Sequence, residues 1–61
     1  MDINVLICDD DPIVHEALGI YFDKYEMKHD SAFDGKECLE KFNNNFYDII
    51  ILDIMMPLID G

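Results

Sequence analysis

The chain has 61 residues, and its 14 acidic against 4 basic side chains give it a formal net charge of −10 at pH 7. A chain of this length forms at most one small domain, and without a basic patch to neutralise phosphates we expect no binding to nucleic acid. No apolar run approaches the roughly 20 residues of a membrane span and the first residues lack a basic leader, so we expect no membrane partner and a cytoplasmic location.

The first two predicted elements are a strand over residues 4–8 and a helix over residues 12–24. The continuous aliphatic run of the strand indicates burial on both faces, as in a parallel sheet. Asp11 is the predicted N-cap of the helix, and Pro12 suits its first position because no N–H is needed there. His15 lies away from the apolar stripe of this helix, and we expect it to be a solvated surface residue. That stripe consists of Val14, Ala17, Leu18, Tyr21, Phe22 and Tyr25.

A shorter and more polar segment, residues 26–33, predicts an edge strand. Met27 and Ala32 are its expected inward positions, and His29 is expected at the surface. A second helix is predicted over residues 36–43, opened by a turn at 34–35 and ended by the asparagines at 43–45. Its expected apolar face carries Cys38, Leu39 and Phe42.

Residues 47–52 predict a third strand, buried among other elements, and residues 55–61 predict a loop. We also expect Phe22, Phe42, Phe46 and Tyr47 to lie in the core or at its rim. The element order is βαβαβ, which is typical of an α/β fold. Right-handed crossovers would then give the parallel strand order 2-1-3, with the first strand central and one helix on each face of the sheet.

The two cysteines, Cys8 and Cys38, are not in a CxxC arrangement. Cys8 lies inside the first apolar run, where we expect a buried, reduced thiol. That state agrees with a cytoplasmic location.

Aspartates follow two of the predicted strands. Asp9, Asp10 and Asp11 come directly after the first strand, and Asp53 follows the third. The carboxyl ends of neighbouring parallel strands meet at one edge of a sheet, so several carboxylates would lie together there. Crowded carboxylates repel unless a cation or a proton intervenes. Oxygen ligands of this kind favour a hard divalent ion, and we expect Mg²⁺. Asp11 is expected to serve only as the helix cap.

Three segments together resemble the receiver domain of two-component response regulators: residues 5–12, the turn at 33–35, and residues 47–61. The resemblance covers the whole chain and implies half of a flavodoxin-like fold. It also implies that Asp53 accepts a phosphoryl group from a histidine kinase. Asp9 and Asp10 match the acidic pair that holds Mg²⁺, with Asp10 as the direct ligand and Asp9 acting through water. Met55 matches the position whose backbone carbonyl completes the metal's protein ligands.

The resemblance is incomplete, because receiver domains are roughly twice as long and contribute a later Ser/Thr and a later Lys to the phosphoryl site. We therefore interpret residues 1–61 as a truncated receiver domain that is not an enzyme and does not signal by itself. The third strand would present an unpaired apolar edge, which favours a homodimer through that edge.

Two other functions remain open. The Asp-x-Asp at the end of the first strand is also found in phosphohydrolases with an aspartate nucleophile, although Pro12 and Ile13 then stand where such enzymes have small and hydroxyl residues. The chain is alternatively a self-associating structural half-domain with vestigial chemistry.

Overall fold

A computed structural model describes residues 2–53 of the chain, so the predicted loop at 55–61 lies outside the described residues. Three strands alternate with two helices, in the order that the sequence predicts. The elements are β1 (Asn4–Cys8), α1 (Pro12–Lys24), β2 (Lys28–Ala32), α2 (Gly35–Asn44) and β3 (Ile49–Leu52). None of the helices within residues 2–53 is long and apolar enough to cross a membrane.

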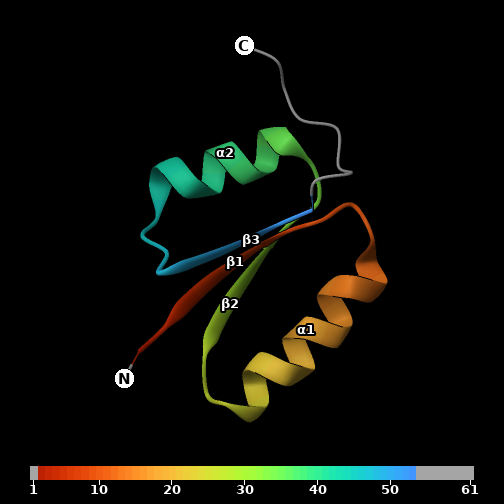
Figure 1. Ribbon diagram of the computed structural model, residues 1–61. Helices are drawn as coiled ribbons and strands as arrows, with labels where there is room; N and C mark the ends of the chain where they lie inside the picture. Colours follow the sequence, from red (N-terminus) through yellow and green to blue (C-terminus); the bar gives the residue numbers. More distant parts are fainter. Residues whose placement is uncertain (1, 54–61) are drawn as a thin grey trace.

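The strands form one parallel sheet in the order β2-β1-β3 (Figure 1). Asn4 pairs with Lys28 at the start of β2, and Cys8 pairs with Leu52 at the end of β3. The predicted order and the central place of β1 are confirmed. Because all three strands run in the same direction, their carboxyl ends lie along one edge of the sheet.

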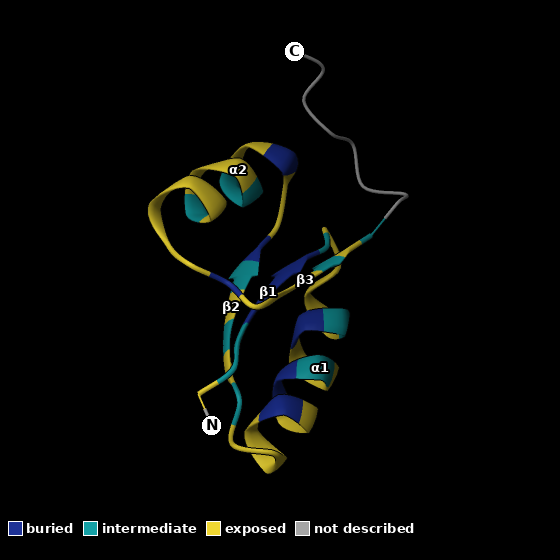
Figure 2. Ribbon diagram, turned by 60° about the vertical axis from the view of Figure 1, so that its left-hand side comes forward, coloured by how far each residue is buried: buried dark blue, intermediate teal, exposed yellow. Residues whose placement is uncertain are grey.

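The side chains of β1 alternate between the two faces of the sheet and form two separate cores. Leu6 and Cys8 pack on the face that α2 covers, together with Ala32 and Tyr47. Val5 and Ile7 pack on the other face, against Phe22 and Leu18 of α1 and against Met27 and Ile51. The two helices therefore lie on opposite sides of the sheet, as predicted (Figure 2). All four of these β1 side chains are fully buried.

Several apolar residues predicted as core are exposed. In β3, Ile49, Ile50 and Leu52 are 40–46% exposed, because β3 pairs only with β1 in the described part of the chain. A sheet of three short strands also gives each helix a narrow surface, so α1 buries only the line of His15, Gly19 and Phe22, and α2 buries only Gly35. The prediction was wrong for the outer residues Tyr21, Tyr25, Leu39, Phe42 and Phe46, which are all more than half exposed.

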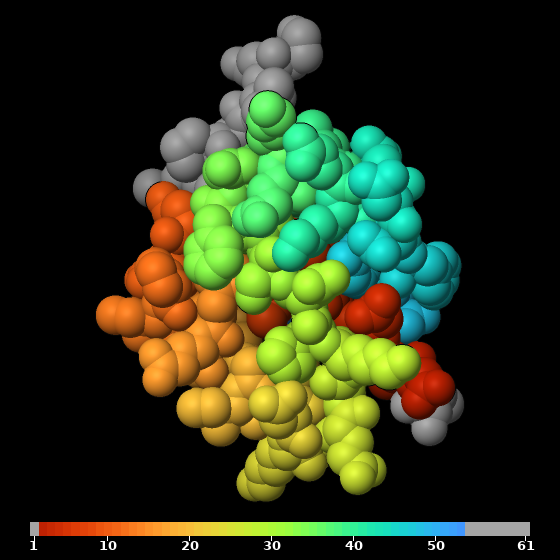
Figure 3. All heavy atoms as spheres, turned by 180° about the vertical axis from the view of Figure 1, so that it is seen from behind, coloured from red at the N-terminus to blue at the C-terminus, as the bar shows by residue number. Residues whose placement is uncertain are grey.

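β2 forms the other edge, and its residues reach the surface between the two helices (Figure 3, yellow-green). This strand is shorter at both ends than the predicted segment 26–33, since Glu26 adopts a left-handed φ of 56° in the turn after α1. β3 begins two residues later than predicted. Asp48 lies just before β3, and its Oδ2 accepts the Asn4 N–H at 2.9 Å. This hydrogen bond links the start of β1 to the residue that precedes β3.

Side chains cap both helices. Asp11 is extended and its Oδ1 accepts the Ile13 N–H at 3.0 Å, with Pro12 at the first position, as predicted. Asp34 caps α2 by accepting the Glu37 N–H at 2.8 Å, and Glu37 in turn accepts the Phe33 N–H at 2.6 Å. These local bonds fix the turns that follow β1 and β2 at the carboxyl edge of the sheet.

Candidate functional site: three carboxylates at the carboxyl edge of the sheet

The fold brings Asp9, Asp10 and Asp53 together. Cys8 and Leu52 are paired across β1 and β3, so the residues that follow them are neighbours, and the Asp53 N–H donates to the Cys8 carbonyl at 2.9 Å. One carboxylate oxygen from each of the three aspartates lies within 4.8 Å of the others. Asp9 and Asp53 are half-buried and Asp10 is exposed.

The chemistry of these groups fits a small divalent cation. All three side chains offer hard oxygen donors, which Mg²⁺ prefers, and Mg²⁺ usually binds through one or two carboxylates while it keeps several waters. The exposure of Asp10 leaves an opening toward solvent on one side of the cluster. Met55, the other residue named for the metal, lies outside the described residues.

Three polar groups of Asp9 form hydrogen bonds: its N–H, its carboxylate and its carbonyl. Its N–H donates to the Ala32 carbonyl at 3.1 Å, and its Oδ1 accepts the Asp11 N–H at 2.9 Å. Its carbonyl oxygen is 2.7 Å from Nε2 of His15. The first residue after β1 is therefore fixed by bonds to β2, to the cap of α1 and to a side chain of α1.

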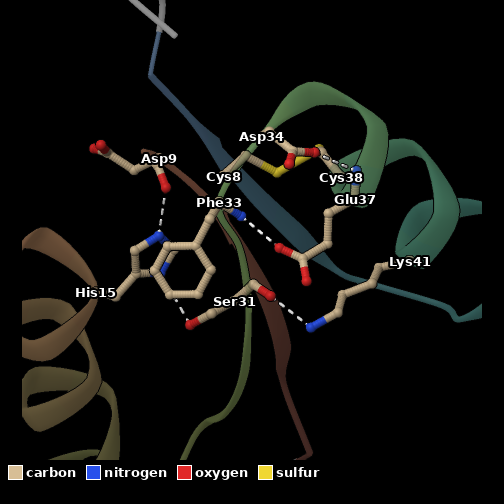
Figure 4. The surroundings of a disulfide bond; sticks show 9 residues. All are labelled: Cys8, Asp9, His15, Ser31, Phe33, Asp34, Glu37, Cys38 and Lys41. Atoms are coloured by element: carbon tan, nitrogen blue, oxygen red, sulfur yellow. Dashed lines mark hydrogen bonds between the residues drawn. A yellow bond between two sulfur atoms is a disulfide. The ribbon is translucent and has the colours of Figure 1, made fainter. Parts of the chain in front are cut away.

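The prediction that His15 is a solvated surface residue was wrong, because its side chain is only 8% exposed. Its Nδ1 lies 2.9 Å from the Ser31 hydroxyl, and its ring lies 4.2 Å from the Phe33 ring between centroids (Figure 4). The buried residues of α1 are His15, Gly19 and Phe22, which are spaced by four and three residues. That helical spacing relative to Phe22 is the sequence signal that places His15 on the inward face.

Cys8 and Cys38 form a disulfide, so the prediction of a reduced Cys8 was wrong, while its burial is confirmed (Figure 4). Packing of α2 on the Leu6 and Cys8 face brings the two Cα atoms to 6.0 Å, within the usual range for a disulfide. Thirty residues separate the two cysteines in sequence, so only the tertiary fold reveals the pair. The bond ties α2 to the residue that precedes Asp9.

A second polar group lies under α2. The Tyr47 hydroxyl donates to Asp30 Oδ2 at 2.8 Å, and Lys41 donates to the Ser31 carbonyl at 2.5 Å, with its Nζ 3.6 Å from Asp30 Oδ1. Burial, followed by the hydrogen bond and the charge of Asp30, raises the pKa of Tyr47 to about 12. Residue patterns alone did not reveal this group, because its members come from β2, from α2 and from the segment between α2 and β3.

The other end of the sheet carries no comparable carboxylate cluster among residues 2–53. His29 is half-buried there, and its Nε2 lies 2.8 Å from Asp23 Oδ1 rather than in open solvent. An open hollow of about 560 Å³ lies beside this pair and is remote from the three aspartates.

Comparison with known proteins agrees with the fold. Residues 5–61 match the family model described as "Response regulator receiver domain". The chain is 40% identical to the response regulator MprA of Mycobacterium sp. (strain KMS) over 63 residues, which cover 100% of this chain and 26% of MprA. It is 31% identical to the peroxide stress-activated histidine kinase mak1 of Schizosaccharomyces pombe, over 95% of this chain and 4% of the kinase.

Among solved structures, the chain is similar to the receiver domain of the Francisella response regulator 1452, with a TM-score of 0.85 and 41% identity. The match covers 95% of this chain and 48% of that domain. The chain thus spans about a quarter or less of these two curated relatives and about half of the solved receiver domain.

Proposed function

This chain belongs to the family of response regulator receiver domains, and we propose that it accepts a phosphoryl group from a histidine kinase on Asp53. The observation that carries the proposal is the cluster of Asp9, Asp10 and Asp53 oxygens within 4.8 Å of one another. Asp53 acts as an acceptor of the group in signalling, and we assign the chain no enzymatic turnover of its own.

Asp53 has the chemistry of a covalent nucleophile. One oxygen of its carboxylate attacks the phosphorus of a phosphohistidine, an O–P bond forms, and the P–N bond breaks with its electron pair left on the imidazole nitrogen. The backbone of Asp53 is fixed to β1 by its N–H bond to the Cys8 carbonyl, so the carboxylate stays at the mouth of the sheet.

The acidic pair would hold Mg²⁺ beside that carboxylate. We propose Asp10 as a direct ligand and Asp9 as a ligand through water, with the backbone carbonyl of Met55 and one oxygen of Asp53 as further ligands. When bound, Mg²⁺ supplies positive charge next to the phosphoryl oxygens. Asp9 and Asp10 would orient that charge, and Asp9 is held by two bonds to its backbone and one to its carboxylate.

We propose that a polypeptide of these 61 residues is labelled slowly and does not pass on a signal. None of its residues matches the later hydroxyl and lysine of the family, which contact the phosphoryl group. One such charge-stabilising donor is typically worth about 2.7–4 kcal/mol in other active sites.

A second candidate role is self-association, favoured by the exposure of β3. Ile49, Ile50 and Leu52 are 40–46% exposed on a strand that pairs on one side only within residues 2–53. An apolar edge of this kind pairs readily with another chain, and we propose a homodimer through β3.

The proposed location is the cytoplasm, as the resemblance to receiver domains implies. Disulfides are rare in cytosolic proteins, where thiols are kept reduced, so the bond between Cys8 and Cys38 is an unusual feature for that compartment.

Labelling with a small phosphodonor, such as acetyl phosphate, tests the proposal. With Mg²⁺ present, intact mass spectrometry should show the gain of one phosphoryl group, and a chelator should abolish it. Asp53→Asn should remove the labelling. Asp48→Asn is the matched control, because Asp48 lies at the other end of β3 and its amide oxygen still accepts the Asn4 N–H. Equal labelling of the Asp53→Asn variant would overturn the proposal.

A further inference from the structure

We propose that His15 is a positioning residue for the carboxylate site, because its imidazole fixes the backbone of Asp9 and thereby the placement of the metal-binding carboxylates. The inference rests on the proposed function, since it assigns a second layer of support to the same Mg²⁺ site. It concerns a residue of α1 that lies outside the acidic cluster itself.

The contacts of the imidazole define its role. A carbonyl oxygen only accepts, so Nε2 carries the hydrogen in its 2.7 Å contact with the Asp9 carbonyl. In the neutral ring, Nδ1 then accepts from the Ser31 hydroxyl at 2.9 Å. Both ring nitrogens are therefore used, one toward the site and one toward β2.

The Asp9 carbonyl belongs to the peptide plane that joins Asp9 to Asp10. β1 ends at Cys8, and His15 holds the carbonyl side of this plane. Of the other two bonds of Asp9, one holds its N–H; the other, from the Asp11 N–H to its carboxylate, spans the plane and limits its rotation without holding the carbonyl itself. Loss of the imidazole would loosen the plane, and the added rotation would move Asp10, the proposed direct ligand, more than Asp9.

The imidazole is itself held in place. The Phe33 ring lies at 4.2 Å between centroids, and the Ser31 hydroxyl fixes the ring orientation (Figure 4). α1 also lies close to β2 at Gly19, one turn beyond His15, where an added Cβ would come within 3.2 Å of His29 Cε1. This close approach of helix and strand explains how a residue on α1 reaches both Ser31 and the end of β1.

A buried histidine with satisfied nitrogens is also a plain core residue, and two substitutions separate the roles. His15→Leu removes both hydrogen bonds but keeps an apolar side chain. His15→Gln keeps a donor at the same number of bonds from Cα, so its Nε2 amide can still donate to the Asp9 carbonyl. A purely structural role predicts no advantage of glutamine over leucine in metal binding.

The experiment measures Mn²⁺ affinity by calorimetry, with Mn²⁺ as a probe for a site built from oxygen ligands. We expect His15→Leu to weaken binding about 10-fold, the lower end of what outer partners of metal ligands contribute. His15→Gln should recover most of that loss. His29→Leu is the matched control, because His29 lies on β2 beside Asp23 at the far end of α1, and this variant should bind like the unchanged chain. Amide hydrogen exchange at Asp10 without metal should accelerate in His15→Leu and not in His15→Gln.

The outcomes are distinct. Unchanged affinity in a folded His15→Leu variant, or equal losses in the leucine and glutamine variants, overturns the role of His15 and leaves the receiver function standing. If the unchanged chain binds no Mn²⁺, the metal site and the role of His15 are both overturned. If His15→Leu fails to fold, Ser31→Ala is the deciding variant, because it removes the hydrogen bond that orients the imidazole. We expect Ser31→Ala to weaken Mn²⁺ binding several-fold. Unchanged Mn²⁺ affinity in this variant overturns the inference.

Discussion

Buried polar side chains in this small domain are tolerated because each has a partner. Among the described residues, no buried side-chain nitrogen or oxygen lacks a hydrogen bond. His15 bridges two elements on the α1 face of the sheet, and Tyr47 joins the core on the α2 face to Asp30. These bonds restrict the polar residues to one arrangement, since an unpaired buried group is costly.

Tyr47 makes stability depend on pH in the alkaline range. Its pKa is raised to about 12 in the folded chain, against 10.0 for the ordinary residue. The folded state therefore holds the proton more tightly, so its contribution is complete below about pH 10 and is lost as the pH rises toward 12. Urea unfolding at a series of pH values should show this decline, and Tyr47→Phe should flatten it while costing about 1 kcal/mol at neutral pH.

Other groups also titrate above pH 10, so the informative quantity is the difference between the two curves. Tyr25→Phe is the control, because Tyr25 is 55% exposed. Parallel curves for the unchanged chain and Tyr47→Phe would show that Tyr47 is not protected by Asp30.

At the scale of elements, the disulfide joins the end of β1 to α2, which otherwise buries little apolar surface. Closing a loop of this length restricts the unfolded chain, and such a bond typically contributes about 2–4 kcal/mol. Cys38→Ser should lower the free energy of unfolding by that amount. A thiol reductant should destabilise the unchanged chain to a similar extent and leave Cys38→Ser unaffected. No response of the unchanged chain to the reductant would show that the bond is absent in solution.

The elements also show what the sequence could reveal. β1 and the start of α1 follow from local chemistry, an aliphatic run followed by Asp11 and Pro12, and both were predicted to the residue. The neighbourhood of Asp9, Asp10 and Asp53 followed from strand direction alone. The bond between Cys8 and Cys38 depends on how α2 packs on the sheet, and local patterns carry no information on that packing. The spacing of His15 from Phe22 did carry a signal for its inward position, but the contacts of its ring with Ser31 and Asp9 depend on how α1 packs.

At the scale of the whole molecule, the chain spans about half of the solved receiver domain that it resembles, and β3 is exposed at the sheet edge in the described residues. We predict that the 61-residue chain is a dimer at micromolar concentration. Ile50→Lys should shift it to monomer, because a charged side chain on an edge strand opposes pairing.

Sedimentation equilibrium measures this shift. Ile20→Lys is the matched control, since Ile20 is 67% exposed on α1 and the same charge is added away from β3. A monomeric unchanged chain with protected β3 amides would contradict the proposed dimer, as would equal effects of the two lysine substitutions.

The central claim is that Asp53 carries the phosphoryl group while Asp9 and Asp10 hold the metal. The most direct test is to label the chain with acetyl phosphate and Mg²⁺, reduce the acyl phosphate with borohydride to homoserine, and locate the homoserine by peptide sequencing. We predict that homoserine appears at position 53 only, and only when Mg²⁺ was present. Homoserine at position 9 would instead identify the nucleophile of a phosphohydrolase and contradict the account.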